Sequence, residues 1–424
     1  MFVADPLTQL LKIVLLALAV LTLWVAVPTG FTSHVGEYFA LMLLAVVGMM
    51  FLVSAENLLG IFLSLELTSL SLYILTAFNK RSLKSAEASL KYFLFGGMAA
   101  AFTLFGMSLL YGLTGEIELR PLAAKLSGVT GDPLFFIALA MTLVGFGFKI
   151  AVVPFHLWAP DAYEGAPAPS AALIAAGSKV ASFFILSKVL LAGMAGAEGS
   201  GRLGHFTPGW MPLLATLALG SMIWGNLAAI AQNNVRRLLA YSAVAHAGYI
   251  LLGILAVGHS GEAEPGMSAL IYYLVIYGLT TVGAFAVVSL VEEKTGSSDM
   301  KAFAGLGRHA PVTSFCMLVF MLSLAGIPPL AGFFGKFYLF AAALKGDAAH
   351  LGLLWLVIAG IAMSAVSLYY YLQVLKQIYV APCNHHQTAN LSITARGSIM
   401  IAATLIIVLG IAPGLLLLRL KAAL

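Results

Sequence analysis

The sequence has 424 residues, of which 61% are hydrophobic and only 9% are charged, and its mean hydropathy is +1.00. Because soluble domains have roughly 25% charged residues, this composition excludes a water-soluble enzyme. The net charge of +5 does not by itself indicate an acidic partner, since in a membrane chain the positions of lysine and arginine matter more than their sum.

Twelve apolar segments, separated by short polar or Pro/Gly-rich stretches, come close to the roughly 20 residues that a membrane-spanning helix needs. In chain order they are 7–27, 38–54, 57–78, 92–112, 134–153, 170–193, 211–231, 238–258, 268–291, 311–345, 352–380 and 397–418. Stretches such as 102–110 are apolar almost throughout, which favours helices over the alternating strands of a barrel. The sequence therefore predicts an all-α polytopic membrane protein, with residues 1–424 forming a single integral domain.

The first segment is expected to remain as a helix, because it is too long for a signal peptide and lacks a basic leader and a cleavage site. Cys316 and Cys383 lie too far apart in the sequence to resemble a redox or metal pair, so no disulfide framework is expected.

Lysine and arginine are unevenly divided between the two sets of loops. The loops after odd-numbered segments hold Lys80, Arg81, Lys84, Arg236, Arg237, Lys294, Lys301, Arg308, Lys376 and Arg396. The other side holds Arg120, Lys125, Arg202, Lys345, Arg419 and Lys421. By the positive-inside rule the larger set is cytoplasmic, which places both termini outside.

Five charged residues fall within or at the edge of apolar segments: Glu66, Lys91, Lys149, Lys179 and Lys336. An ionised side chain at the bilayer centre costs roughly 2.5–3.5 kcal/mol on insertion scales, so such residues are functional candidates by default. We place Lys91 at the start of its segment, where its side chain either snorkels to the membrane surface or has a role at the edge of the loop. The same explanation applies to Lys12 and Lys188, which also lie near segment ends. The other four are our candidates for proton translocation.

The alternative for these four residues is a buried ion pair that only stabilises the fold. Four central charges in one chain exceed what structural pairing usually requires, which favours function. Burial lowers the pKa of a lysine and raises that of a glutamate, whereas a nearby opposite charge acts the other way. A carboxylate that moves toward or away from a buried lysine therefore controls whether that lysine holds a proton.

Helix-breaking residues interrupt two of the segments. A Gly-Phe-Gly-Phe run precedes Lys149 and is followed by Pro154, and the sequence Gly-Ile-Pro-Pro at 326–329 is followed by a Gly-Phe-Phe-Gly run that precedes Lys336. Backbone freed by proline at membrane depth must be buried in protein or line a water-filled cavity. Matching breaks in two halves of a chain indicate inverted repeats with ion sites at the broken helices.

We therefore predict two inverted five-helix repeats with discontinuous helices, the first at about 28–193 and the second at about 211–380, followed by a C-terminal helix at 397–418. Lys149 and Lys336 then lie on the fourth helix of each repeat.

His246 lies in the middle of segment 238–258, and a histidine titrates near neutral pH, so it is a candidate proton relay. A neutral histidine bonded to a hydroxyl or a carbonyl explains it equally well. For His156, beside Pro154, the structural explanation has the greater weight. The sequence has no G-x-G-x-x-G after a strand, no Walker motif and no helical bis-histidine or cysteine cluster, so no cofactor or metal site is expected.

Four stretches resemble the antiporter-like subunits of respiratory complex I and their cation/proton antiporter relatives. They are KIAVVPFHLWAPDAYEGAPAPS at 149–170, NNVRRLLAYS at 233–242, LSLAGIPP at 322–329 and GFFGKF at 332–337. The resemblance covers essentially the whole chain. The sequence is most similar to the N-type subunits of the NADH:quinone oxidoreductase, because Lys336 stands where M-type subunits have glutamate and no long lateral helix of the L-type follows the last segment. The run LYYYL at 368–372 is also N-like.

The resemblance implies roles for the four charges: Glu66 matches the coupling glutamate, Lys149 its partner lysine, Lys179 the central-axis lysine and Lys336 the lysine of the exit half-channel. It implies a subunit that couples electron transfer from NADH to quinone to proton pumping and has no redox site of its own. NADH, flavin, iron–sulfur clusters and quinone would belong to other subunits. Bacterial members usually have fourteen helices, so the chain is expected to begin at the third.

The partners implied are other membrane-arm subunits and the lipid of a bacterial inner membrane, with quinone involved only indirectly and no nucleic acid. Two alternatives remain open. The same fold serves Na⁺/H⁺ antiporters and membrane-bound hydrogenase-type complexes. The second alternative is that the chain binds quinone and takes part in electron transfer, or serves only as an assembly scaffold. The lack of a cofactor site disfavours direct electron transfer, but an apolar quinone pocket leaves little trace in a sequence.

Overall fold

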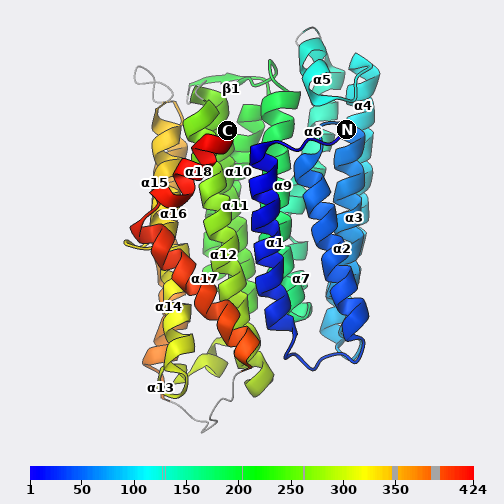
Figure 1. The fold of residues 1–424 in the computed structure, drawn as a ribbon. Coiled ribbons are helices and arrows are strands. Elements are labelled where there is room, and N and C mark those ends of the chain that lie inside the picture. The colour runs from blue at the N-terminus through cyan, green and yellow to red at the C-terminus, as the bar shows by residue number, and fades with distance from the viewer. Residues whose placement is uncertain (127, 129, 203, 261–262, 346–351, 383–391) are drawn as a thin grey trace.

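The computed structural model describes the chain except for residues 127, 129, 203, 261–262, 346–351 and 383–391. The helices form an elongated bundle, and both termini lie at the same end of it (Figure 1). Cys383 lies outside the described residues, whereas Cys316 is buried as a free thiol.

Among the described residues, eleven helices are long and apolar enough to cross a membrane. They are α1 (Pro6–Ala26), α2 (Val35–Ser54), α3 (Leu58–Thr76), α4 (Leu83–Thr114), α6 (Pro133–Ile150), the continuous helix Ala168–Gly193, α10 (Trp210–Ile230), α11 (Val235–Ser260), α12 (Ala263–Thr295), α16 (Leu354–Tyr379) and α17 (Ile393–Ile411). The helix Ala168–Gly193 consists of α8 (Ala168–Leu173), a π-helical turn (Ile174–Ser178), α9 (Lys179–Lys188) and a second π-helical turn (Val189–Gly193). This architecture confirms the predicted all-α polytopic class.

Shorter elements complete the chain. They are α5 (Leu119–Leu126), α7 (Trp158–Gly165), a 3₁₀ turn (Met300–Phe303), α13 (Leu306–His309), α14 (Pro311–Ala325), α15 (Ala331–Leu344) and α18 (Gly414–Ala423). An antiparallel hairpin joins β1 (Ser200–Arg202) to β2 (His205–Thr207). The segment expected at 397–418 is thus two helices, since α17 ends at Ile411 and α18 follows after a short turn.

Polar residues at the helix ends and within the helices satisfy the backbone locally. The carboxylate of Asp5 accepts a hydrogen bond from Thr8 N at 2.7 Å, and the Asn57 side chain accepts one from Gly60 N at 2.7 Å. Inside the bundle the hydroxyl of Thr22 donates to the carbonyl four residues earlier. Such bonds matter in a membrane, where an unpaired polar group has no water to bind.

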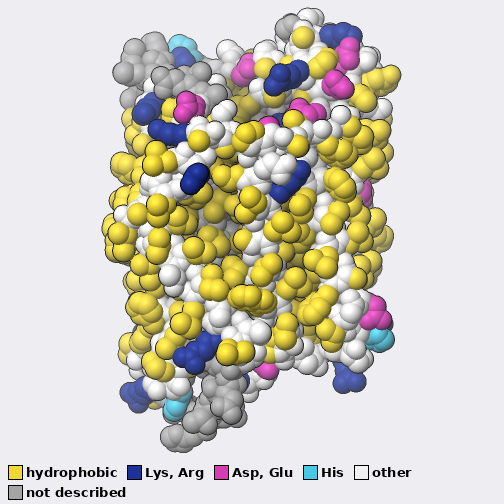
Figure 2. Space-filling view, in the orientation of Figure 1, with side chains coloured by type: hydrophobic (Ala, Val, Ile, Leu, Met, Phe, Trp, Pro, Cys, Tyr) yellow, Lys and Arg dark blue, Asp and Glu magenta, His cyan; other side chains and the backbone are white. Residues whose placement is uncertain are grey.

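Three helices form the centre of the bundle. The apolar windows of Ala168–Gly193, α11 and α12 are 94%, 94% and 100% buried, whereas those of α4 and α16 are only 33% buried. The apolar side chains of the outer helices therefore lie largely on the outside of the bundle. Figure 2 shows hydrophobic side chains over the middle of one face and charged ones toward its ends.

The helices of the two halves pack in the same pattern. In the first half α2 packs on α3 and on α9, and in the second half α10 packs on α11 and on α16. This correspondence agrees with two five-helix repeats, and an odd number of membrane crossings per repeat makes them inverted. The residue limits of the repeats, 28–193 and 211–380, remain a prediction.

Both predicted breaks are present. The first begins after its glycine run, whereas the second precedes its glycine run, which lies in the first turns of α15. Helix α6 continues through Gly145 and Gly147 to Ile150, and the chain turns over 151–157 before α7. In the second half α14 ends at Ala325, Gly326 adopts a left-handed φ of 85°, and α15 begins at Ala331. The single segment expected at 311–345 is therefore two half-helices.

The placement of Lys91 was wrong. Helix α4 begins at Leu83, so Lys91 lies two turns inside it rather than at its start. Its ammonium forms ion pairs with Glu87 at 2.7 Å and with Asp161 of α7 at 2.8 Å. The side chain is 41% exposed, which agrees with the structural explanation and not with a central charge.

Close packing of α10 on α11 predicts a contrast between two glycines of α10. A Cβ at Gly225 would lie 2.5 Å from the backbone nitrogen of Ala245, whereas at Gly220 the nearest atom would be 3.7 Å away. We expect Gly225→Ala to destabilise the bundle by about 1–3 kcal/mol, because the two helices must separate. Thermal unfolding of the purified protein measures this, with Gly220→Ala as the control. Equal melting temperatures for the two variants would contradict the packing.

Candidate functional site

Glu66 and Lys149 line the same small cavity. Glu66 lies in the middle of α3 and is partly exposed, and Lys149 lies in the last turn of α6 and is 6% exposed. The cavity has a volume of about 20 Å³ and is also lined by Ser69, Tyr73 and Thr103. That volume is enough for about one water molecule, and the walls offer polar partners for it. The two charges predicted to act together thus share one polar space.

The ammonium of Lys149 has no hydrogen-bond partner among the described residues. Its Nζ has no hydrogen bond to any described residue, although it is buried. The rings of Tyr73 and Tyr92 lie 5.7 Å and 6.0 Å from it, within range of cation–π attraction. A buried ammonium without hydrogen bonds is costly, so its charge state is sensitive to a change at Glu66 across the cavity.

Trp158, the first residue of α7, fixes the end of the helix that carries Lys149. Its indole Nε1 donates to the carbonyl of Phe148 at 2.9 Å. Its ring stacks on Tyr92 with a centroid distance of 4.2 Å and an angle of 3°. The position of α7 therefore affects the positions of Phe148, which precedes Lys149, and of Tyr92, whose ring faces Lys149.

Lys179 lies at the centre of the bundle and is 1% exposed. Its Nζ donates to the carbonyl of Ala243 on α11 at 2.8 Å. A π-helical turn, Ile174–Ser178, immediately precedes it. Such turns are frequent at functional sites, where they change the direction in which side chains leave the helix.

His246 is joined to two tyrosines. Its Nδ1 lies 2.6 Å from the hydroxyl of Tyr273 on α12, and its Nε2 lies 3.2 Å from that of Tyr371 on α16. The Tyr371 hydroxyl also bonds to Ser242 at 2.5 Å. A neutral imidazole both donates and accepts a hydrogen bond, so this arrangement suits either a relay or a fixed polar contact.

Lys336 lies across the second break and is held by the end of the preceding half-helix. Its Nζ donates to the carbonyls of Leu324 at 2.9 Å and Ala325 at 3.1 Å, and to the hydroxyl of Ser364 at 2.8 Å. The ring of Tyr249 lies 5.0 Å from it. Carbonyls freed at a helix end carry negative partial charge, so α14 stabilises the ammonium directly.

Helix α11 connects the two buried lysines on either side of it. Ala243 accepts from Lys179, His246 lies one turn further along, and Tyr249 faces Lys336 after another turn. These positions follow one another at intervals of three residues around the helix, and Ala243 and Tyr249 are about 9 Å apart along its axis. The structure thus brings Lys179, His246 and Lys336 together along one helix.

Sequence reasoning missed the neutral partners of these charges. Tyr273, Tyr371 and Ser364 hold His246 and Lys336, and Asn226 bonds to the hydroxyls of both Tyr249 and Tyr370. Tyrosines and an asparagine inside apolar segments were a usable signal, because a polar group at membrane depth needs a hydrogen-bond partner.

Of the remaining candidates, Lys188 fits a structural role. Lys188 forms an ion pair with Glu56 at 2.5 Å, near the end of its helix. His156 is buried beside Trp224 and Tyr241, and neither ring nitrogen bonds to a described residue. Among the described residues no group of three His, Cys, Asp or Glu side chains is placed to hold a metal ion.

The chain is similar to known proteins in both sequence and fold. The family model for the NADH:quinone oxidoreductase/Mrp antiporter transmembrane region matches residues 55–365, which include Glu66, Lys149, Lys179 and Lys336. The chain belongs to this family. The resemblance seen in the sequence is confirmed.

Relatives by sequence are subunits of one complex. NADH-quinone oxidoreductase subunit N 2 of Acidobacterium capsulatum is 52% identical, over 98% of this chain and 85% of the relative. Subunit N 1 of Roseiflexus castenholzii is 39% identical, over 98% of this chain and 78% of the relative.

Solved structures agree on the fold. A chain of respiratory complex I from Thermus thermophilus has a TM-score of 0.81 at 36% identity, covering 100% of this chain and 88% of that one. A chain of the Mrp complex from Dietzia sp. has a TM-score of 0.85 at 21% identity, covering 100% of this chain and 83% of that one. At that identity the second match shows the fold alone.

The short bond between His246 and Tyr273 predicts a loss of stability when the hydroxyl is removed. We expect Tyr273→Phe to cost about 1–3 kcal/mol, because it leaves a buried imidazole nitrogen without its partner. The melting temperature of the purified complex measures this. Tyr369→Phe on α16 is the control, since Tyr369 is 55% exposed. A Tyr273→Phe complex as stable as the control would show that the bond contributes nothing.

Proposed function

We propose that this chain is a proton-translocating membrane subunit of a respiratory NADH:quinone oxidoreductase. The observation that carries the proposal is Lys149, a buried ammonium with no hydrogen bond to a described residue, in a polar cavity that it shares with Glu66. A purely structural lysine is expected to have a paired carboxylate, as Lys188 has in Glu56. A lysine without one is able to change its protonation when its surroundings change.

The first step belongs to the Glu66–Lys149 cavity. When Glu66 is ionised and close, it favours the charged form of Lys149, and when Glu66 is neutral or draws away, the lysine loses that support. The single water that fits the cavity offers a path between the carboxylate and the amine. Conformational change elsewhere in the complex acts on the chain through this pair.

Later steps follow α11. A proton released from Lys149 is taken up at Lys179, which a backbone carbonyl of α11 holds. His246, with tyrosine hydroxyls on both ring nitrogens, relays it toward Lys336. Lys336 then releases it on the far side, where the carbonyl end of α14 and Ser364 hold the ammonium until it is displaced. Each group only binds and passes a proton, so the chain itself needs no redox centre.

The relatives support this complex over the other users of the fold. Both relatives by sequence described above carry the name subunit N of NADH-quinone oxidoreductase. A chain of an archaeal membrane-bound sulfane sulfur reductase is also similar, with a TM-score of 0.85 at 25% identity over 99% of this chain and 82% of that one. The lower identity of that chain places it further away than the N-type relatives.

The surroundings follow from the same assignment. The partners are other subunits of the membrane arm, against which the apolar outer faces of helices such as α4 pack, and lipid covers the rest. NADH, flavin, iron–sulfur clusters and quinone belong to other subunits. The membrane is the inner membrane of a bacterium.

Replacing Lys149 by alanine tests the proposal. We expect Lys149→Ala to lower NADH-driven proton pumping by about a hundredfold or more, because a positioned proton carrier contributes about 10²–10⁴-fold in rate. Pumping is measured in membrane vesicles and normalised to assembled complex and to electron transfer.

Lys301→Ala is the matched control, since Lys301 is an exposed lysine outside the bundle core. Normal pumping by an assembled Lys149→Ala complex would reduce this chain to a scaffold with buried charges. Sodium-dependent exchange in place of proton pumping would assign it to the antiporter class.

A further inference from the structure

The half-helix α7 belongs to the first half of the chain but is held by the second. It packs against α4 on one side and against α11 on the other. Its N-terminal end contacts the backbone next to Lys149 through Trp158. Its C-terminal end, Glu164 to Ala166, points into a cavity of about 510 Å³ at the end of the bundle.

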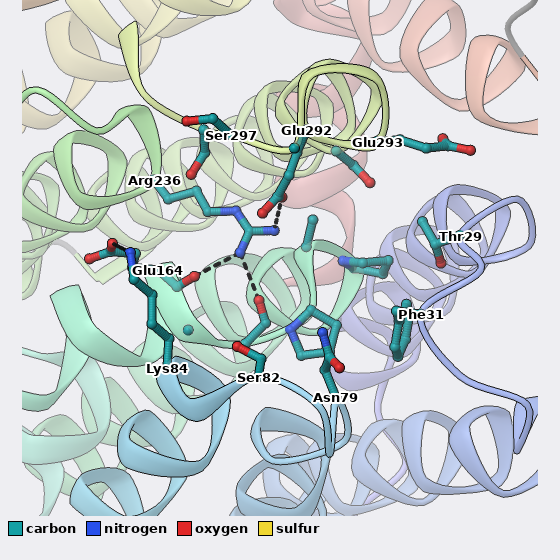
Figure 3. A pocket seen from close by; sticks show the side chains of 18 of the residues that line it. Thr29, Phe31, Asn79, Ser82, Lys84, Glu164, Arg236, Glu292, Glu293 and Ser297 are labelled. Atoms are coloured by element: carbon teal, nitrogen blue, oxygen red, sulfur yellow. Dashed lines mark hydrogen bonds and ion pairs between the residues drawn. The ribbon is translucent and has the colours of Figure 1, made fainter. Parts of the chain in front are cut away.

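Arg236 holds this C-terminal end. Its Nη1 donates to the carbonyls of Glu164 at 2.9 Å and Ala166 at 2.7 Å, and its Nη2 pairs with Glu292 of α12 at 2.5 Å. Figure 3 shows the guanidinium between α7 and α12 with all three interactions. The side chain is only 3% exposed, which makes it a buried arginine committed to one geometry.

The chemistry of the contact favours arginine. A cation at a helix C-terminus interacts favourably with the helix dipole, and the carbonyls there have no partner within the helix. The planar guanidinium is able to bind two carbonyls and one carboxylate at once, which a lysine ammonium matches poorly. Arg236 therefore ties the end of α7 to α12 with defined direction.

The neighbouring residue adds a second contact from the same turn of α11. Arg237 pairs with Asp161 at 2.7 Å and with Glu164 at 3.1 Å, both on α7. Asp161 also pairs with Lys91 of α4. These side chains are 18–41% exposed, so they contribute less than the buried Arg236 contact.

The opposite end of α7 reaches Lys149. Trp158 is bonded to the carbonyl of Phe148 and stacked on Tyr92, which faces the Lys149 ammonium. Helix α7 is only eight residues long, about 12 Å, and its internal hydrogen bonds make it a short rigid element between its two ends. A shift at its arginine-bound end is therefore transmitted to its tryptophan end.

We propose that Arg236 is a positioning residue for Lys149, acting through α7 and Trp158. In this way α11 and α12 of the second half, which carry the His246 cluster, set the geometry of the lysine in the first half. The inference rests on the proposed role of Lys149 in proton translocation. It adds a mechanical connection between the two halves that does not pass through Lys179.

Two variants in the complete complex test the connection from its two ends. Arg236→Gln removes the charge at the C-terminus of α7, and Trp158→Phe removes the indole donor to Phe148 while keeping an aromatic ring. We expect each to lower proton pumping per assembled complex by about tenfold, because a displacement of about 1 Å at a distance from the chemistry costs up to about a hundredfold. Arg236→Lys, which keeps the charge, recovers part of the loss.

The double variant and the pH profile separate positioning from general stability. If both residues act through α7, the double variant pumps no more slowly than the slower of the two single variants. Both single variants then shift the pH profile of pumping in the same direction. Arg81→Gln, an exposed arginine in the loop before α4, is the control and leaves rate and profile unchanged.

If Arg236 has only a structural role, the Arg236→Gln variant gives a different result. The amount of assembled complex falls, but pumping per complex and its pH profile stay normal, and this result overturns the inference. Losses that multiply in the double variant overturn it as well. If the Arg236→Gln complex does not assemble, the test depends on Trp158→Phe. Normal pumping with a normal pH profile in that variant would show that α7 does not transmit a displacement to Lys149, and this overturns the inference. Normal pumping by Lys149→Ala, in contrast, contradicts the proposed function itself.

Discussion

The cost of placing a charge inside a membrane is the constraint on which this structure depends. Lys179 and Lys336 meet it with backbone carbonyls, one from α11 and two from the end of α14. Lys149 has only aromatic faces and a small polar cavity. The bundle thus holds three buried lysines in different environments, and such differences shift the balance between the charged and neutral forms of each lysine.

Broken helices supply the polar groups that the lysines need. An unbroken helix uses its own carbonyls, but the end of a half-helix leaves some of them free. At the second break these carbonyls bind Lys336 directly. At the first break Arg236 binds the far end of α7 instead, and Lys149 remains without them. The two halves therefore use the same architectural feature with different results.

The central helices connect these environments. Helices α11 and α12 are almost completely buried and lie between the outer helices of both halves. The middle of α11 contacts Lys179, carries His246 and faces Lys336, while its first turn holds α7 through Arg236 and Arg237. A single helix is thus placed to affect the buried lysines of both halves.

The sequence by itself determined the class of the protein, the approximate spans, the two breaks and the four charged candidates, because hydropathy, proline and ionised groups act locally and each has a large energetic effect in a membrane. Only the tertiary structure decided which groups surround each charge. Asp161 at Lys91, Ser364 at Lys336 and Tyr371 at His246 come from helices further along the chain. Their pairing depends on how helices rotate and pack, which no local pattern specifies.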